Sequence, residues 1–258
     1  MKFIEPIIIA FSMYSKIPMP IINWNKDNMK YIMCYFPLIG IAICLLQFLL
    51  FYISKIFSFG NILTATIATI IPLLITGGIH LDGFCDTIDG LSSHQSIDKK
   101  LEILSDPNSG AFAIIGCIIY IIVNFSIWTE IVPTIKSISI IGLFYSMSRS
   151  FSGLSIVTFP LAKNTGLAAI FSNNAQKNNV KMTMIIYIVF LTIITSLIEV
   201  RYSILALCFT LAIFIYYKHI SKKEFGGITG DLAGFFLQNA ELSILVAIMV
   251  GQKIFGIL

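Results

Sequence analysis

Apolar residues occur along this 258-residue chain in long runs that short polar segments separate. A helix needs about 20 apolar residues to cross the roughly 30 Å hydrocarbon core of a bilayer. Seven runs are long enough, and they cover approximately residues 31–57, 61–81, 111–132, 137–159, 182–199, 202–218 and 232–255. The sixth is short, and only Glu199 and Arg201 separate it from the fifth. The pattern predicts an all-α, polytopic integral membrane bundle of about seven transmembrane helices, the second running on past residue 81.

A shorter apolar segment, residues 3–17, precedes these spans and ends at the sequence IPMP. Pro18 and Pro20 disfavour continuation of a helix through this point. The segment is too short to span comfortably, which predicts an interfacial or re-entrant helix. Its apolar stretch is interrupted and no small-residue cleavage pattern follows, so a signal peptide is not expected. No repeat, low-complexity tract or linker divides the chain, and residues 1–258 are expected to form one membrane domain.

Composition agrees with a membrane protein, because 57% of the residues are hydrophobic, 12% are charged and the mean hydropathy is +0.90. Seven crossings place twelve lysines on the side of the N-terminus and four basic residues on the other side. Since basic loops stay in the cytoplasm, we expect a multi-pass cell-membrane protein with its N-terminus and residues 80–90 on the cytoplasmic side. The net charge of +4 comes without the long basic runs typical of nucleic-acid binding.

Three aspartates follow the second apolar run in the sequence HLDGFCDTIDG. Asp82, Asp86 and Asp89 are spaced i, i+4, i+7, which places them within roughly 60° of one helical face. Carboxylates that converge near lipid repel one another unless a cation lies between them. Mg²⁺ prefers such oxygen ligands and bridges them to phosphates. Gly83 and Gly90 follow aspartates directly and remove side-chain bulk where a phosphate or metal would approach.

The same spacing has other interpretations. The aspartates could face water at a solvated helix end, and calcium or sodium sites use the same ligands. His80 lies on the far side of the helix, which indicates a packing or interfacial residue rather than a ligand.

Two further segments carry candidate chemistry. Residues 96–112 predict a short amphipathic helix on the membrane surface, followed by Asp106, which is either a turn residue or a fourth acidic group. The segment GGITGDLAGFFLQNAE opens the last span, and Gly227, Gly230 and Asp231 place backbone N–H groups at a helix N-terminus, where an anion can bind.

Two charged residues are predicted to lie inside spans. Glu241 follows Asp231 by about 15 Å along the helix axis, and Arg149 interrupts the fourth span. Intramembrane charges pair with one another or mark functional sites. The sequence leaves open whether Arg149 pairs with a carboxylate or contacts a substrate phosphate.

Several stretches together resemble one family. The sequences HLDGFCDTIDGL, LEILSDPNSGAFA and GGITGDLAGFFLQNAELS, with FSMYSKIPMP and YFPLIG near the N-terminus, are similar to adenosylcobinamide-GDP ribazoletransferases, also called cobalamin synthases. The resemblance runs from residue 11 to about 243 in the family's order. The chain departs from the family at Phe84-Cys85 and in the wording DLAGFFLQNAE, which leaves fine substrate preference open.

The resemblance implies a magnesium-dependent membrane enzyme that joins adenosylcobinamide-GDP to α-ribazole, or to its 5′-phosphate, and releases GMP. It makes Asp82, Asp86 and Asp89 the metal-binding face, includes Asp106 in the site and places Asp231 and Glu241 in the last motif. Asp89 and Asp106 are the candidates to take the hydroxyl proton. A homo-oligomer, or association with other cobalamin-assembly enzymes, is compatible with this interpretation.

Two other classes compete with it. A CDP-alcohol phosphotransferase also displaces a nucleoside monophosphate with an aspartate stripe, but an Ala-Arg pair should follow the first Asp-Gly soon, and here Leu91 and Ser92 follow Gly90. An ion-coupled transporter would carry charges near mid-membrane in several spans and broken helices in two corresponding halves. The acidic residues instead collect at one face.

Overall fold

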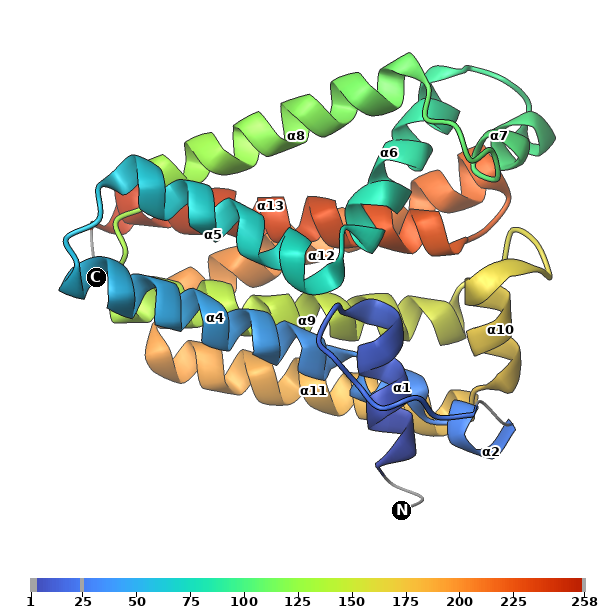
Figure 1. Cartoon of the computed structure of the whole chain (residues 1–258), viewed down its shortest axis with the longest axis horizontal. Helices are drawn as coiled ribbons and strands as arrows, with labels where there is room; N and C mark the ends of the chain where they lie inside the picture. Colours follow the sequence, from blue (N-terminus) through green and yellow to red (C-terminus); the bar gives the residue numbers. More distant parts are fainter. Residues whose placement is uncertain (1–3, 24–25, 257–258) are drawn as a thin grey trace.

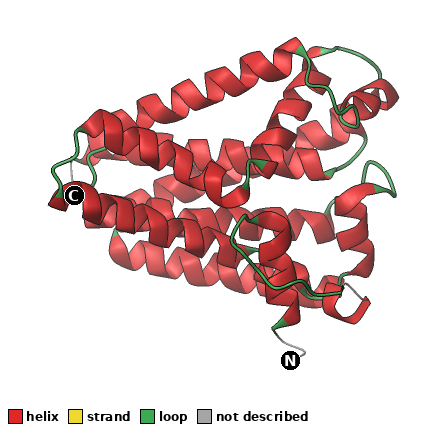
Figure 2. Cartoon of the chain, viewed as in Figure 1, coloured by secondary structure: helices red, strands yellow, loops and turns green. Residues whose placement is uncertain are grey.

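The computed structural model describes residues 4–23 and 26–256. These residues form helices joined by short loops, with one isolated β-bridge between Leu161 and Ile228, so the predicted all-α class is confirmed (Figure 2). The helices are α1 (Glu5–Tyr14), α2 (Lys26–Met29), α3 (Ile32–Tyr35), α4 (Pro37–Ile56), α5 (Asn61–Thr76), α6 (Ile79–Ser92), α7 (Ile97–Ile103), α8 (Ala111–Glu130), α9 (Ile135–Thr158), α10 (Gly166–Asn174), α11 (Lys177–Ile198), α12 (Val200–Phe225) and α13 (Gly230–Phe255).

Within residues 4–23 and 26–256, six helical segments are long and apolar enough to cross a membrane, and the pair α5 and α6 adds a seventh if it counts as one span. The six are Ile32–Ile56, which joins α3 and α4, and the helices α8, α9, α11, α12 and α13. The prediction of about seven spans is therefore confirmed. The sixth predicted span, which the apolar pattern made short, is long in the structure: α12 continues beyond residue 218 until Gly226, whose φ of 74° ends it. Lysine, histidine and glutamate are all compatible with a helix, so the charges after residue 217 do not stop it.

The second predicted helix does not run straight past the aspartates, and that prediction is wrong. The chain bends by 94° between α5 and α6. Gly77 and Gly78 have φ angles of 64° and 78°, a left-handed backbone that glycine adopts readily. Their N–H groups bond back to the carbonyls of Leu74 and Leu73 and close the end of α5. The aspartates therefore lie on a separate helix.

The N-terminal apolar segment forms α1, which ends before the prolines as expected. Its ten residues are too few to cross a bilayer. Residue 3, where the predicted segment begins, lies outside the described residues. The predicted short helix on the membrane surface is α7. It ends at Ile103, and a loop leads from it to α8.

The long helices pack around α9 and α13, most of whose residues are buried. α9 contacts α4, α11 and α13, and α13 also packs against α12 and α6. Figure 1 shows α6 running across the direction of these long helices, between the first half of α13 and the start of α8. This crossing brings the sequence HLDGFCDTIDG of α6 next to the start of α13, which carries GGITGDLAGFFLQNAE.

Candidate functional site

Four carboxylates gather where α6 crosses the first turn of α13. Asp82 is exposed, Asp86 and Asp89 are half-buried on α6, and Asp231 comes from α13. The negative charges of Asp82, Asp231 and Asp89 all act on the Asp86 carboxyl. Lys163 acts on Asp231 from the loop between α9 and α10. Within the described residues, however, none of the four carboxylates has a basic side chain at salt-bridge distance, so no ion pair neutralises their charge.

A close helix crossing brings Asp231 to this face. A β-carbon at Gly83 would lie 2.7 Å from the Cα of Asp231, and one at Gly234 would lie 2.9 Å from the carbonyl oxygen of His80. These distances are shorter than van der Waals contact, so only glycine permits the backbones to approach this closely. Gly83 therefore provides the packing contact that sets Asp231 beside Asp82 and Asp86.

Asp89 has a structural role that the sequence did not reveal. Its Oδ2 accepts a hydrogen bond from the backbone N–H of Gly110 at 2.8 Å, and its Oδ1 accepts one from Ala113 at 3.3 Å. Gly110 is the N-cap of α8 and offers no side chain for capping. A carboxylate at this position satisfies free N–H groups and interacts favourably with the helix dipole. Asp89 thus fastens the start of α8 to α6.

Asp106 lies in the loop that Asp89 holds, on the surface. Its Oδ1 accepts hydrogen bonds from the backbone N–H and the side-chain Nδ2 of Asn108, both at 2.9 Å. These bonds hold the pKa of Asp106 below its usual value. Asp106 thus forms a turn with Asn108, and no contact joins it to Asp82, Asp86 or Asp231 in the part of the chain that the structure describes.

Three other glycines of the motifs differ in their surroundings. Gly90 is buried, and a β-carbon there would lie 2.8 Å from Leu104, so the space expected for a ligand is filled by protein. Gly227 packs against the backbone of residues 160–162, where Ile228 N–H bonds to the carbonyl of Pro160 at 2.8 Å. Only Gly230, the first residue of α13, opens to free space among these three.

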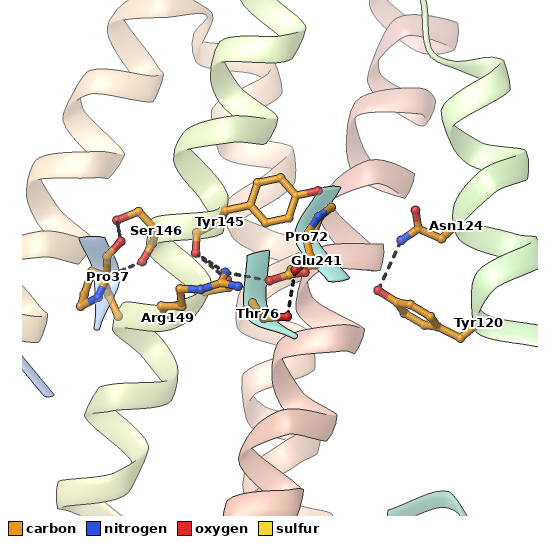
Figure 3. A network of polar contacts seen from close by, with 11 residues as sticks. Pro37, Pro72, Thr76, Tyr120, Asn124, Tyr145, Ser146, Arg149 and Glu241 are labelled. Atoms are coloured by element: carbon orange, nitrogen blue, oxygen red, sulfur yellow. Dashed lines mark hydrogen bonds and ion pairs between the residues drawn. The ribbon is translucent and has the colours of Figure 1, made fainter. Parts of the chain in front are cut away.

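Arg149 and Glu241 form a buried ion pair in the middle of the bundle. Arg149 Nη1 donates to Glu241 Oε1 at 2.7 Å and to the carbonyl of Tyr145 at 2.8 Å (Figure 3). The relative exposure of the two side chains is 1% and 4%. Of the two alternatives for Arg149, the structure shows the carboxylate pair. The pair joins α9 to α13.

His80 is a packing residue, as predicted. It is buried, and its ring lies 6.2 Å from that of Tyr14 and 5.9 Å from that of Phe36. It faces α1 and the start of α4 rather than the carboxylates. Its Nε2 has no hydrogen-bond partner among the described residues.

Asp82 lines a cavity of about 550 Å³. The end of α1 and the segment after it, the bend between α5 and α6, the first turns of α6 and the start of α8 line it. Lys16 also lines this cavity and was not among the predicted site residues. Only the sequence SKIPMP pointed towards it, and the spacing gave no reason to bring that segment to the aspartates.

Known proteins similar to this chain agree on one family. The model of cobalamin-5-phosphate synthases matches residues 6–249. An adenosylcobinamide-GDP ribazoletransferase of Lachnoclostridium phytofermentans is 44% identical over 98% of this chain and 97% of its own length. Enzymes of the same name from Clostridium perfringens and Treponema denticola are 31% and 32% identical over 93% and 92% of this chain, and 96% and 95% of their own. No solved structure matches the chain. With its site motifs and nearly its whole length matched, the chain belongs to the cobalamin-5-phosphate synthase family.

Proposed function

We propose that this protein is an adenosylcobinamide-GDP ribazoletransferase that completes cobalamin assembly. It joins adenosylcobinamide-GDP to α-ribazole, or to α-ribazole 5′-phosphate, and releases GMP. The product is adenosylcobalamin or its phosphate. The observation that carries this proposal is the meeting of two family motifs, on α6 and α13, in one group of carboxylates beside a cavity.

The donor set suits a hard divalent cation such as Mg²⁺. Asp82, Asp86 and Asp231 offer carboxylate oxygens with no basic partner within 4.0 Å among the described residues, and such charge is costly near lipid. As the side chains stand, no three of the described His, Cys, Asp or Glu residues are close enough to hold a metal ion. Changes of rotamer would be needed for these aspartates to share one.

We assign the metal-binding role to Asp82, Asp86 and Asp231. Asp89, which the sequence also predicted as a ligand, already accepts two backbone hydrogen bonds. Mg²⁺ would supply charge neutralisation for the diphosphate and for the departing GMP.

The reaction exchanges one phosphorus–oxygen bond for another. A free ribose hydroxyl oxygen of α-ribazole forms a bond to the phosphorus attached to cobinamide. It is not the 5′ oxygen, because α-ribazole 5′-phosphate carries its phosphate there. The bond from that phosphorus to the oxygen of GMP breaks, and the hydroxyl proton passes to a carboxylate. A proton acceptor works best when its pKa lies near the working pH. The lowered pKa of Asp106 makes it a weak acceptor, and both carboxylate oxygens of Asp89 already accept backbone N–H groups.

Asp89 and Asp106 are therefore assigned to positioning, and the proton to a carboxylate oxygen of Asp82, Asp86 or Asp231 that does not hold the metal. Asp89 holds the loop of Asp106 against α6. The buried pair of Arg149 and Glu241 holds α13 against α9, which keeps Asp231 in place. Gly230 leaves room for a phosphate at the start of α13. Gly83, Gly90 and Gly227 act through the packing of the elements around the site.

We further propose that the site faces the cytoplasm. The end of the bundle with α7, α10 and the start of α13 lies to the right in Figure 1. Lys99, Lys163, Lys222 and Lys223 belong to α7, the α9–α10 loop and the last turns of α12, which lead to this end. Basic residues mark the cytoplasmic side of membrane proteins.

The test uses the purified protein in lipid nanodiscs with adenosylcobinamide-GDP and α-ribazole. GMP and the corrinoid product are followed with Mg²⁺ present and after its removal by a chelator. Release of GMP matched by adenosylcobalamin, and restored by adding Mg²⁺ back, is the expected result. Folded protein that releases no GMP would refute the assignment, and turnover that survives the chelator would refute the role of the metal.

A further inference from the structure

The cavity beside the carboxylates is lined by one lysine side chain, Lys16, that the proposed function does not use. Lys16 and Asp82 both line this space of about 550 Å³, together with Gly77, Gly78 and Ser109. In the described part of the chain, Lys16 has no carboxylate within 4.0 Å and its side chain makes no hydrogen bond. A lysine and an acidic group therefore share the cavity without neutralising each other.

The fold fixes the position of Lys16 at two points. Its backbone N–H donates to the carbonyl of Ile75 at 2.7 Å, which ties the segment after α1 to the last turn of α5. Its side-chain stem crosses Gly77, where a β-carbon would lie 2.8 Å from the Lys16 Cγ. Any residue larger than glycine at position 77 would therefore displace the Lys16 stem. That residue would also be strained by the φ of 64° at this position. The bend that redirects α6 thus also seats this lysine.

The first turn of α6 adds positive potential to the same cavity. Gly78 is the N-cap of α6 and provides no capping side chain, while Ile79 and Leu81 line the cavity. The free N–H groups of a first helical turn carry a partial positive charge. Lys16 and this turn give the cavity a region of positive potential, and Asp82 places a negative charge on the same cavity.

We propose that Lys16 binds the diphosphate of the nucleotide-activated substrate, which rests on the function proposed above. A diphosphate can meet a divalent cation with some of its oxygens and an ammonium group with others, so it fits a cavity that offers both kinds of contact. Lys16 is a substrate-binding residue that recognises the charged linkage between the guanosine and the corrinoid. It does not recognise the corrinoid itself.

The test compares Lys16→Met with the wild-type protein. Methionine keeps an apolar stem over Gly77 and removes only the charge, so folding should be preserved. Binding of GDP and of adenosylcobinamide-GDP should weaken about tenfold to a hundredfold, the range expected for hydrogen bonds to charged groups. Binding of adenosylcobinamide, which has no phosphate, should not change. The KM for adenosylcobinamide-GDP should rise by a similar factor, and Lys16→Arg should restore most of the loss.

Lys55→Met is the matched control, because Lys55 is also exposed but lies in the last turn of α4 and lines a different cavity. It should bind all three ligands as the wild-type protein does. Equal GDP binding by Lys16→Met and the wild-type protein would overturn the proposal, as would an equal loss for adenosylcobinamide. Because GDP binding is measured without turnover, an inactive wild-type protein would refute the enzyme assignment and leave this result readable.

Discussion

Asp89 and Gly110 lie 21 positions apart in the chain, and the carboxylate of the first accepts the backbone N–H of the second at 2.8 Å. The carboxylate sits so close that a β-carbon at Gly110 would lie 2.7 Å from its Cγ. The bond makes one acidic residue of the stripe a cap for another helix. It also explains why glycine stands at the end of the loop that carries Asp106.

Gly110→Ala is expected to destabilise the protein by about 1–3 kcal/mol, the range found for overpacking. The added methyl group would push Asp89 away from the N-terminus of α8. Gly60→Ala is the control, because Gly60 is also an N-cap glycine with extended backbone, and nothing lies within 4 Å of its absent β-carbon. Chemical unfolding in detergent measures both. Equal stability of the two variants would contradict the capping role of Asp89.

Gly83→Ala should separate α6 from α13 and weaken transfer. The methyl group would meet the backbone of Asp231, which cannot move aside as a side chain can. We expect a loss of about 1–3 kcal/mol in unfolding free energy, with a fall in kcat that adding Mg²⁺ does not restore. Gly230→Ala, which adds a methyl group in open space on α13, is the control for stability. Wild-type stability in Gly83→Ala would disprove the close crossing.

Asp82→Asn, Asp86→Asn and Asp231→Asn should each abolish magnesium-dependent release of GMP while the protein still folds. Each change removes one charged oxygen ligand and lowers the repulsion among the remaining carboxylates. The stability of these variants should therefore equal or exceed that of the wild-type protein. Asp98→Asn, at an exposed aspartate of α7, is the control and should keep full activity. Retained activity in all three variants would remove the proposed metal site.

Asp106→Asn should keep activity and leave the stability close to that of the wild-type protein, as surface substitutions commonly do. Asparagine can still accept from the N–H groups of Asn108. Because the pKa of Asp106 is lowered, its carboxylate stays charged until the pH falls below the ordinary pKa of an aspartate. Because Asp106 is not assigned as the proton acceptor, its replacement should leave the neutral and alkaline parts of the pH–rate profile unchanged. A large loss of kcat would return Asp106 to the reacting centre.

Arg149→Met and Glu241→Met should each destabilise the protein by about 3 kcal/mol or more, because each leaves one charge buried without a partner. The double variant should recover much of that loss, since both charges are then gone. Unfolding of the four proteins forms a double-mutant cycle. If the losses of the single variants simply added, the ion pair would not be coupled. An active double variant would show that neither side chain is needed to hold substrate.

The apolar pattern predicted the helices well because each span is long and uniform. It failed at Gly77 and Gly78, where the chain bends although the composition on either side remains compatible with one helix. The glycine pair was visible in the sequence, but glycine is also tolerated within membrane helices. The i, i+4, i+7 spacing of Asp82, Asp86 and Asp89 was correct as local geometry. It could not distinguish a ligand from a cap, because the partner of Asp89 lies on another helix.

Contacts between distant segments account for the rest of what the sequence did not reveal. Arg149 and Glu241 are 92 positions apart, and their pairing was one of two alternatives that only packing decides. Lys16 is held beside the cavity by a backbone hydrogen bond to Ile75, which lies 59 positions later in the chain. A hydrophobic pattern reports which side of a helix is buried. It does not report which neighbour covers it.

The 94° bend also determines how far the aspartates reach. A straight continuation of α5 would have carried the fourteen residues of α6 about 20 Å farther along the bundle axis. Its end would then project beyond the first turn of α13, and Asp89 would have no helix beside it to cap. Because α6 lies across the bundle instead, its first residues line the cavity and Asp89 near its end reaches the start of α8. The residues that resembled an extension of a span therefore build the site.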